Sequence, residues 1–136
     1  MGFVYDKDLI GYINIFENIT KVKVKGCHKS DNELIFIIDP MYISKAIGKN
    51  GVNVKEVSRL LRKTIKIVGY DSDVTKFIKN LIAPIDGKIY KESEEVIAIR
   101  LTNNKDKGLV IGRDKKNINN IQNIVSSFFS VKIRIL

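Results

Sequence analysis

The sequence has a single cysteine, Cys27, and a single histidine, His28, among its 136 residues. One cysteine cannot form an internal disulfide, so nothing indicates an oxidising compartment. The Cys27-His28 pair also lacks a second ligand pair at metal spacing, which argues against a zinc site. A nucleophile-and-base constellation cannot be built around this one histidine. We therefore expect a protein that is not an enzyme and that holds no metal and no cofactor.

Long hydrophobic runs are absent as well. No stretch approaches the roughly 18 consecutive apolar residues that a transmembrane helix requires, and the start of the chain lacks the pattern of a signal peptide. Acidic residues are in deficit, with 15 against 24 lysines and arginines, which gives a net charge of +9. The excess is spread over both halves of the chain. We expect a soluble cytoplasmic protein whose partner is nucleic acid or another polyanion.

What the sequence does contain is a short glycine loop, Ile47-Gly48-Lys49-Asn50-Gly51, between two apolar segments. Glycines let the backbone adopt conformations closed to other residues and approach a ligand closely. The free N–H groups at the start of the following helix would suit a phosphate. By itself a Gly-x-x-Gly loop is a weak signal, and a plain turn between two helices is the alternative reading.

The loop recurs about two-thirds of the way along the chain as Gly112-Arg113-Asp114-Lys115. The two copies are 64 residues apart (112 minus 48), and the match continues into the next segment. A duplicated unit of roughly 65 residues accounts for nearly the whole chain, so we expect one domain over 1–72 and another over 73–136. The matched pairs are Gly48 with Gly112, Asn53 with Asn117, Val54 with Ile118, Val57 with Ile121, Leu60 with Ile124 and Leu61 with Val125.

Each half shows the same order of predicted elements, from helical spacing and from β-branched runs. The pattern predicts an α+β fold in sandwich-like layers, with a three-stranded sheet packed on three helices in each domain. Either Asp6 or Asp8 is a candidate N-cap, a turn is expected around Ser30-Asp31-Asn32, and a helix cap is expected within 69–72. The first half has helices over 7–19, 43–47 and 52–63 and strands over 22–25, 34–38 and 65–68. The second has helices over 74–82, 107–111 and around 118–125 and strands over 88–90, 96–101 and 131–135.

A Gly-x-x-Gly loop between a short and a longer amphipathic helix, followed by a strand and used twice, resembles the KH domain. The leading helix and two strands are similar to its type II form. Four segments are similar to the archaeal NusA-like proteins: 16–20 (FENIT), 46–51 (AIGKNG), 77–84 (FIKNLIAP) and 106–109 (DKGL). Those are tandem-KH proteins assigned to transcription termination or antitermination. The resemblance implies two tandem type II KH domains, single-stranded RNA and RNA polymerase as partners, and favours a monomer.

The expected RNA contacts lie in and just after the two loops. Gly48 and Gly51 keep side chains away from the sugar-phosphate path, and Lys49 adds charge to the dipole of the following helix. Bases would lie along an aliphatic groove between that helix and the adjoining strand, lined by residues such as Ile47, Val54 and Ile67. The predicted contacts are Ile47, Gly48, Lys49, Asn50, Gly51, Asn53, Val54, Lys55, Gly112, Arg113, Asp114, Lys115, Lys116 and Asn117.

The second loop departs from the pattern. Lys115 stands where the second glycine is expected, and Asp114 places a negative charge beside the phosphate path, which Arg113 and Lys116 could offset. A non-glycine residue in a left-handed conformation costs roughly 1 kcal/mol, so a reshaped loop is an alternative to a strained one. We expect the first loop to be the fuller clamp and the second to be weaker or differently selective.

Two other functions fit the same residues. One is an RNA-binding factor in ribosome assembly or RNA decay, and the other is a protein-interaction adaptor that does not bind RNA. The basic helix face over 55–63 is equally readable as a solvated surface. The loops lack the Gly-Lys-Ser/Thr ending of a nucleotide-hydrolysing loop, and the carboxylates over 92–95 look solvated, so catalysis has no support.

Overall fold

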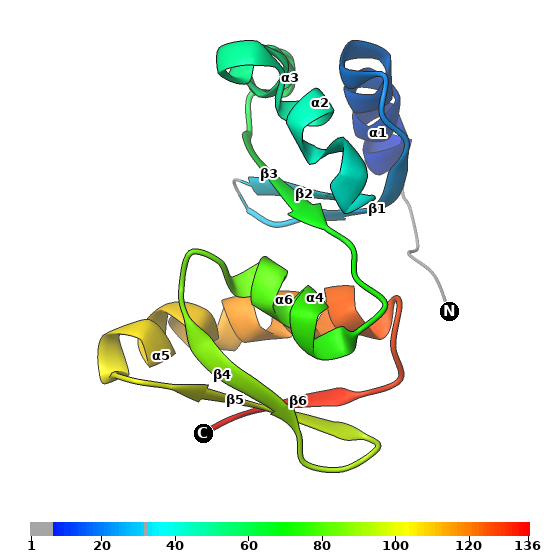
Figure 1. Cartoon of the computed structure of the whole chain (residues 1–136). Coiled ribbons are helices and arrows are strands. Elements are labelled where there is room, and N and C mark those ends of the chain that lie inside the picture. Colours follow the sequence, from blue (N-terminus) through cyan, green and yellow to red (C-terminus); the bar gives the residue numbers. More distant parts are fainter. Residues whose placement is uncertain (1–6, 32) are drawn as a thin grey trace. The chain divides into compact units, whose positions relative to one another are not determined.

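The computed structural model describes residues 7–31 and 33–136, which form two compact units that divide between Asp71 and Ser72. Each unit repeats the order helix, strand, strand, helix, helix, strand (Figure 1), so the predicted α+β class with two three-stranded sheets is confirmed. The first unit comprises α1 Lys7–Thr20, β1 Val24–Lys29, β2 Glu33–Ile38, α2 Ile43–Ile47, α3 Val52–Leu61 and β3 Thr64–Gly69. The second comprises α4 Val74–Ile82, β4 Gly87–Lys91, β5 Val96–Leu101, α5 Asn104–Ile111, α6 Lys116–Ser126 and β6 Lys132–Ile135.

Both sheets have the same topology. An antiparallel hairpin (β1–β2, β4–β5) is followed by a strand that pairs in parallel with the second hairpin strand (β2–β3, β5–β6). Parallel neighbours need a crossover connection, and here two helices joined by a glycine loop provide it. Figure 1 shows the helices of each unit on one side of that unit's sheet. The crossover therefore holds each loop at a helix-to-helix junction.

The core of the first unit lies between its sheet and its helices. Leu34, Phe36 and Ile38 alternate along β2 toward the helices and are fully buried, as expected for one face of a strand. Phe16 of α1 stacks on Phe36, with ring centroids 4.2 Å apart and planes inclined by 17°. Val57 of α3 is buried in the same cluster. This packing fixes the helix that follows the first loop.

The second unit has a core of its own. The apolar face predicted for α4 is buried throughout, and the rings of Phe77 and Phe128 form a T-shaped contact at a centroid distance of 5.5 Å. In β5, Ile97 and Ile99 are fully buried. The buried residues of α4 and α6 are Val74, Phe77, Ile78, Leu81, Ile82, Ile121, Ile124 and Val125.

Two details differ from the predicted elements. The first strand runs over Val24–Lys29 instead of 22–25, because the register shifts between Val24 and Gly26 and breaks the period-two alternation. Leu60, expected on the apolar face of its helix, has 46% of its surface exposed. Asp8, one of the two candidate caps, lies within the first turn of α1, whereas Asp6 and the turn position Asn32 lie outside the described residues.

The cap of one helix and the start of another also differ from the prediction. Asp73, rather than a residue of 69–72, caps α4: its Oδ1 accepts hydrogen bonds from the backbone N–H and the hydroxyl of Thr75, and these bonds lower the pKa of Asp73. The helix α5 starts at Asn104, because the Asn103 side chain accepts a hydrogen bond from the N–H of Asp106. None of the helices in the described part of the chain is long and apolar enough to cross a membrane.

Candidate nucleic-acid interface

The first loop reverses the chain within four residues. Gly48 ends α2 with φ 80° and ψ 166°, and both Asn50 (φ 56°, ψ 26°) and Gly51 (φ 74°, ψ 19°) are left-handed before α3 begins. The N–H of Gly48 donates to the Ser44 carbonyl, and the N–H of Gly51 donates to the Gly48 carbonyl, each at 3.0 Å. The loop is a tight, internally bonded turn that exposes the start of α3.

The two glycines of this loop are required for different reasons. A Cβ atom on Gly48 would lie 2.9 Å from Cγ of Asn53 and 3.0 Å from its backbone N, which are clashing distances. A Cβ atom on Gly51 would meet only Cε of Lys55, at 3.7 Å. Gly48 is therefore needed for space and conformation together, and Gly51 for conformation alone.

Asn53 holds the loop in shape. Its Nδ2 donates to the carbonyl of Lys45 at 3.0 Å, which joins the first turn of α3 to α2. Asn117 does the same in the second unit, donating to the carbonyls of Leu109 (3.1 Å) and Val110 (3.0 Å). Both asparagines were predicted to contact RNA. In the structure each one joins the helix after its loop to the helix before it, a shared role that their equivalent places in the repeat could have indicated.

The second loop has the same backbone as the first. Gly112 (φ 77°, ψ 169°), Asp114 (φ 54°, ψ 30°) and Lys115 (φ 62°, ψ 18°) reproduce the first loop's angles to within about 12°. The alternative of a reshaped loop is therefore wrong. Lys115 adopts the left-handed conformation itself, because the space around the corresponding glycine, Gly51, is open to a side chain.

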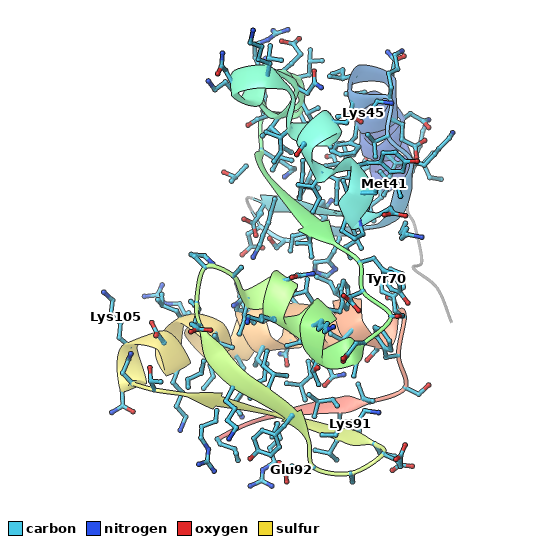
Figure 2. The ribbon with its side chains drawn as sticks, in the orientation of Figure 1. Met41, Lys45, Tyr70, Lys91, Glu92 and Lys105 are labelled. Carbon is cyan, nitrogen blue, oxygen red and sulfur yellow. The ribbon has the colours of Figure 1, made fainter. Side chains whose placement is uncertain are left out.

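Positive charge surrounds the first loop. Lys45, Lys49 and Lys55 are all exposed there, from α2, the loop and α3 respectively, and Figure 2 labels Lys45. Further along α3, Arg59 is bound by Glu56, whose pKa this hydrogen bond lowers. The positive field along α3 is therefore weaker than the number of arginines and lysines on this helix suggests. It is strongest at the end of α3 that adjoins the loop.

Apolar side chains lie beside this charge. Ile47 and Val52 flank the loop with 38% and 57% of their surfaces exposed, whereas Val54 and Ile67 are half-buried. Met41, labelled in Figure 2, is 77% exposed just before α2. The exposure of Val52 and Met41 was not predicted from the sequence, because isolated exposed apolar residues leave no periodic signal. The aliphatic groove along Ile47, Val54 and Ile67 stays a prediction.

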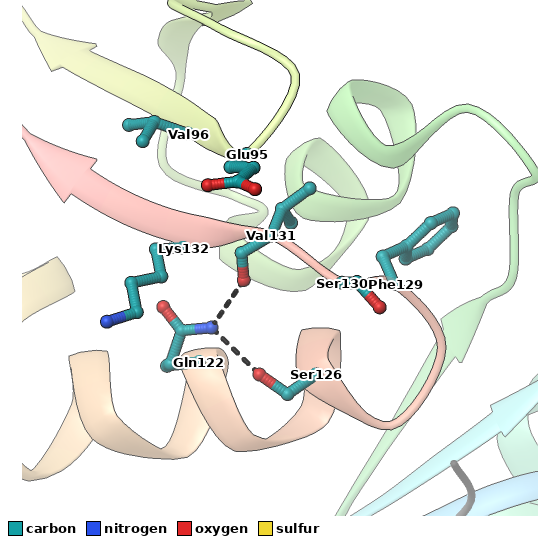
Figure 3. A pocket seen from close by; sticks show the side chains of 8 residues that line it. All are labelled: Glu95, Val96, Gln122, Ser126, Phe129, Ser130, Val131 and Lys132. Carbon is teal, nitrogen blue, oxygen red and sulfur yellow. Dashed lines mark hydrogen bonds between the residues drawn. The ribbon is translucent and has the colours of Figure 1, made fainter.

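In the second unit, a surface pocket of about 570 Å³ lies where α6 ends and β6 begins (Figure 3). Gln122 bridges the two elements: its Nε2 donates to Ser126 Oγ (2.9 Å) and the Val131 carbonyl (3.0 Å), and its Oε1 accepts from the Ile133 N–H (2.8 Å). The pocket is therefore a hollow between a helix and its adjoining strand. It is lined by Glu95, Val96, Gln122, Ser126, Phe129, Ser130, Val131 and Lys132.

The described part of the chain offers few side chains for acid–base or metal chemistry. Within residues 7–31 and 33–136, no three His, Cys, Asp or Glu side chains are grouped so that they could hold a metal ion. Cys27 is buried in the first core, and that burial raises the pKa of its thiol to about 12. A thiol in this state is a small apolar side chain rather than a nucleophile.

Known proteins share this architecture. A family model described as the NusA-like second KH domain matches residues 17–73. A "Probable transcription termination protein NusA" of Methanocaldococcus jannaschii is 31% identical over 128 residues, covering 91% of this chain and 70% of the relative. The protein of the same name from Methanococcus vannielii is 30% identical over 123 residues, covering 88% and 71%. A solved structure titled "Crystal structure of APE1850" is similar with a TM-score of 0.72 and 28% identity, covering 97% of this chain and all of that one. This chain belongs to the family of archaeal NusA-like proteins with KH domains.

Proposed function

We propose that this protein is a non-enzymatic, cytoplasmic RNA-binding protein that acts in transcription termination, antitermination or elongation, with single-stranded RNA held at both glycine loops. Its family and the names of its relatives support a role in transcription. The observation that carries the proposal is the duplicated loop, which keeps one left-handed backbone path although its side chains differ. Residues 1–72 and 73–136 are then two KH domains.

At the first loop, the sugar-phosphate backbone passes over Gly48 and Gly51, where no side chain intervenes. The exposed N-terminus of α3 supplies unpaired N–H groups and the positive end of the helix dipole, which favour a phosphate. Lys45, Lys49 and Lys55 add a sequence-independent attraction that weakens as salt rises. The clamp therefore positions RNA, and discrimination among bases falls to the apolar side chains beside it.

At the second loop the phosphate path carries different charges. Arg113, Lys115 and Lys116 bring three cations, and Asp114 brings one anion into the middle of them. The Lys115 side chain also occupies the place that Gly51 leaves open in the first loop. Because the two backbones agree, any difference in affinity between the loops arises from these side chains. We propose that the first loop is the stronger clamp.

The test is fluorescence anisotropy with single-stranded RNA across a salt series. Replacing Lys49 and Asn50 by aspartate should weaken binding at least tenfold, by about the effect of several lost phosphate interactions. The matched control is Lys79→Asp with Asn80→Asp, the same residue types adjacent on α4, which should change affinity less than about twofold. Equal losses in the two variants would show that only net charge matters and would refute the clamp.

The corresponding variant of the second loop, Arg113→Asp with Lys115→Asp, ranks the two loops. A loss as large as that of the first-loop variant would contradict the stronger first clamp. RNA polymerase is the protein partner that the transcription role implies, and copurification of the two in the presence of nuclease tests it. Recovery of ribosomal precursors instead, with no polymerase, would favour the assembly function.

A further inference from the structure

The second sheet has a face turned away from the helices of its own unit. In β5, Ile97 and Ile99 are buried toward the helices, so Ala98 and Arg100 lie on the opposite face. The residues that pair with Val96, Ala98 and Arg100 on the neighbouring strands β4 and β6 lie on the same face. We call the following five residues the outer face: Lys88, Tyr90, Arg100, Lys132 and Arg134.

The outer face is rich in exposed cations. Lys88, Arg100 and Lys132 are exposed, and within residues 7–31 and 33–136 none of them forms an ion pair. Arg134, with 60% of its side chain exposed, is bonded to Glu92 at 2.9 Å. Two more carboxylates lie at one end, where Asp86 and Asp106 line a pocket with Lys88 and Arg100. The cations therefore dominate the strands themselves, and the anions lie at their ends.

The fold does not require these charges. Lys88 lies directly opposite Arg100, and like charges at such positions destabilise a sheet. In the first unit the same pairing positions hold Gly26 opposite Ile37, so the architecture forms without the two cations. A repulsive pair that the fold can dispense with points to a ligand of negative charge.

An aromatic side chain lies among the cations. Tyr90 and Arg134 flank Ala98 on neighbouring strands. Ala98 is fully buried, as expected for a small residue between two long ones. Tyrosine rings and arginine guanidinium groups are the side chains on which unpaired bases stack. The first unit has His28 opposite Ile35 at the place of Tyr90 opposite Ala98. The combination of charge and stacking surface favours a single-stranded nucleic acid over an acidic protein.

The outer face adjoins the pocket at the end of α6. Lys132 belongs to both, and Val96, its partner in the sheet, also lines the pocket (Figure 3). The pocket lies at the opposite end of α6 from the second loop, and the 11 residues of this helix span about 16 Å. A KH loop clamps about four nucleotides. A strand that follows α6 from the loop therefore reaches the edge of the outer face with the next nucleotides.

We propose that the outer face is a second RNA-contact surface, on which a strand leaving the second loop continues with a base stacked on Tyr90 and phosphates held by Lys88, Arg100 and Lys132. This inference rests on the proposed function for the direction of the strand. It adds to the loops a surface that extends the length of RNA that one chain holds.

Charge removal with a matched control tests the surface. Lys88→Gln with Arg100→Gln is compared with Lys76→Gln with Lys79→Gln, which removes the same charge from exposed positions of α4. For a 20-nucleotide RNA, the outer-face variant should lose about five- to tenfold in affinity, and the slope of log Kd against log salt should fall by about 1.4, two phosphate contacts' worth. The control should lose less than about twofold. A 6-nucleotide RNA should bind both variants about equally well.

The outer-face variant should melt no lower than the parent chain, because the substitution removes a repulsive pair. This separates lost binding from lost folding. Photo-crosslinking of RNA that carries 5-iodouridine should label Tyr90 in the parent chain. Equal affinities of the two glutamine variants for the long RNA, or no label on Tyr90, would overturn the proposal.

The loop variants distinguish this proposal from the proposed function. If the aspartate substitutions at both loops leave affinity unchanged while the outer-face variant loses it, the clamp fails and the outer face stands alone as the RNA site. If the loop variants lose affinity and the outer-face variant keeps it for both RNA lengths, the clamp stands and the outer face does not bind RNA. Retention of an acidic protein by the outer face in that second case would assign it to protein contact.

Discussion

The clearest quantitative consequence of the loop geometry concerns Gly48. In Gly48→Ala the new Cβ would lie 2.9 Å from Cγ of Asn53 and 3.0 Å from its backbone N. The backbone N cannot move without shifting the first turn of α3, so overpacking of this kind costs about 1–3 kcal/mol. The backbone angles, φ 80° and ψ 166°, lie within a region that is almost confined to glycine, and a residue with a side chain pays about 1–3 kcal/mol there. Together the two terms predict a loss of about 2–6 kcal/mol in the free energy of unfolding.

Gly51→Lys is the informative comparison, because the second unit already has lysine at that place. The added Cβ meets only a flexible side-chain atom at 3.7 Å, so no packing term arises. The left-handed conformation costs roughly 1 kcal/mol, and the loss of glycine's freedom in the unfolded chain offsets part of it. The net loss should stay below about 1 kcal/mol. Gly112→Ala, whose Cβ would lie 2.7 Å from Cβ of Asn117, should behave like Gly48→Ala.

Urea unfolding of the full chain, followed by far-ultraviolet circular dichroism, measures these differences, and RNA anisotropy measures their effect on binding. The expected order of stability is parent, then Gly51→Lys, then the two alanine variants together. The RNA affinity of Gly51→Lys then reports what a lysine side chain does on an unchanged backbone. A Gly48→Ala protein as stable as Gly51→Lys would refute the steric argument and with it the distinction between the two glycines.

Four further outcomes are expected. Asn53→Ala removes the 3.0 Å bond to the Lys45 carbonyl and should cost about 1 kcal/mol in urea unfolding, with weaker RNA binding and unchanged secondary structure. Cys27 should react with a thiol reagent at pH 8 only after unfolding, since a pKa raised from 9.0 to about 12 lowers its thiolate fraction about a thousandfold; rapid reaction of the folded chain would contradict its burial. Because the thiol of Cys27 has the higher pKa in the folded chain, its contribution to stability is complete below pH 9.0 and is lost as pH rises toward 12. The free energy of unfolding should therefore be lower at pH 10 than at pH 8. Phe16→Ala removes the ring stacked on Phe36 and should lower the free energy of unfolding in urea by about 3–5 kcal/mol. A loss below about 1 kcal/mol would contradict the importance of this contact.

The sequence predicted the helices and strands correctly where an element buries one face in the core. The helix α4 presents Val74, Phe77, Ile78, Leu81 and Ile82 at helical spacing, and all five are buried. The strand β5, a largely apolar segment with three β-branched residues (Val96, Ile97 and Ile99), was placed at its observed bounds. The fixed offset between the two loops indicated the repeat. In each case a single periodic pattern determines the answer, because the core accepts one face of the element.

What the sequence could not supply was local backbone geometry. The bulge between Val24 and Gly26 changes which residues of β1 face the core, and no period reveals it. Asp73 acts as a cap through a hydrogen bond to a residue two places on, a choice that neighbouring polar residues could equally have made. At the second loop, the glycine rule suggested reshaping, whereas the open space beside Gly51 shows why Lys115 fits the same turn. The residue type alone indicates what a left-handed backbone costs at Lys115. It does not indicate how much space the folded loop leaves for the side chain.

The repetition of one loop geometry on a single chain has a consequence for the strength of binding. Two sites that are covalently joined convert the second capture of a strand into an intramolecular event, with an effective concentration in the millimolar range for a short connection. If both loops bind one RNA strand at the same time, as proposed, combined avidity exceeds either loop's own affinity by about 10²–10⁴. Each clamp can therefore be weak enough to release its segment quickly while the other retains the strand. A chain of this kind could follow a growing transcript by alternate release and recapture, without dissociating from it.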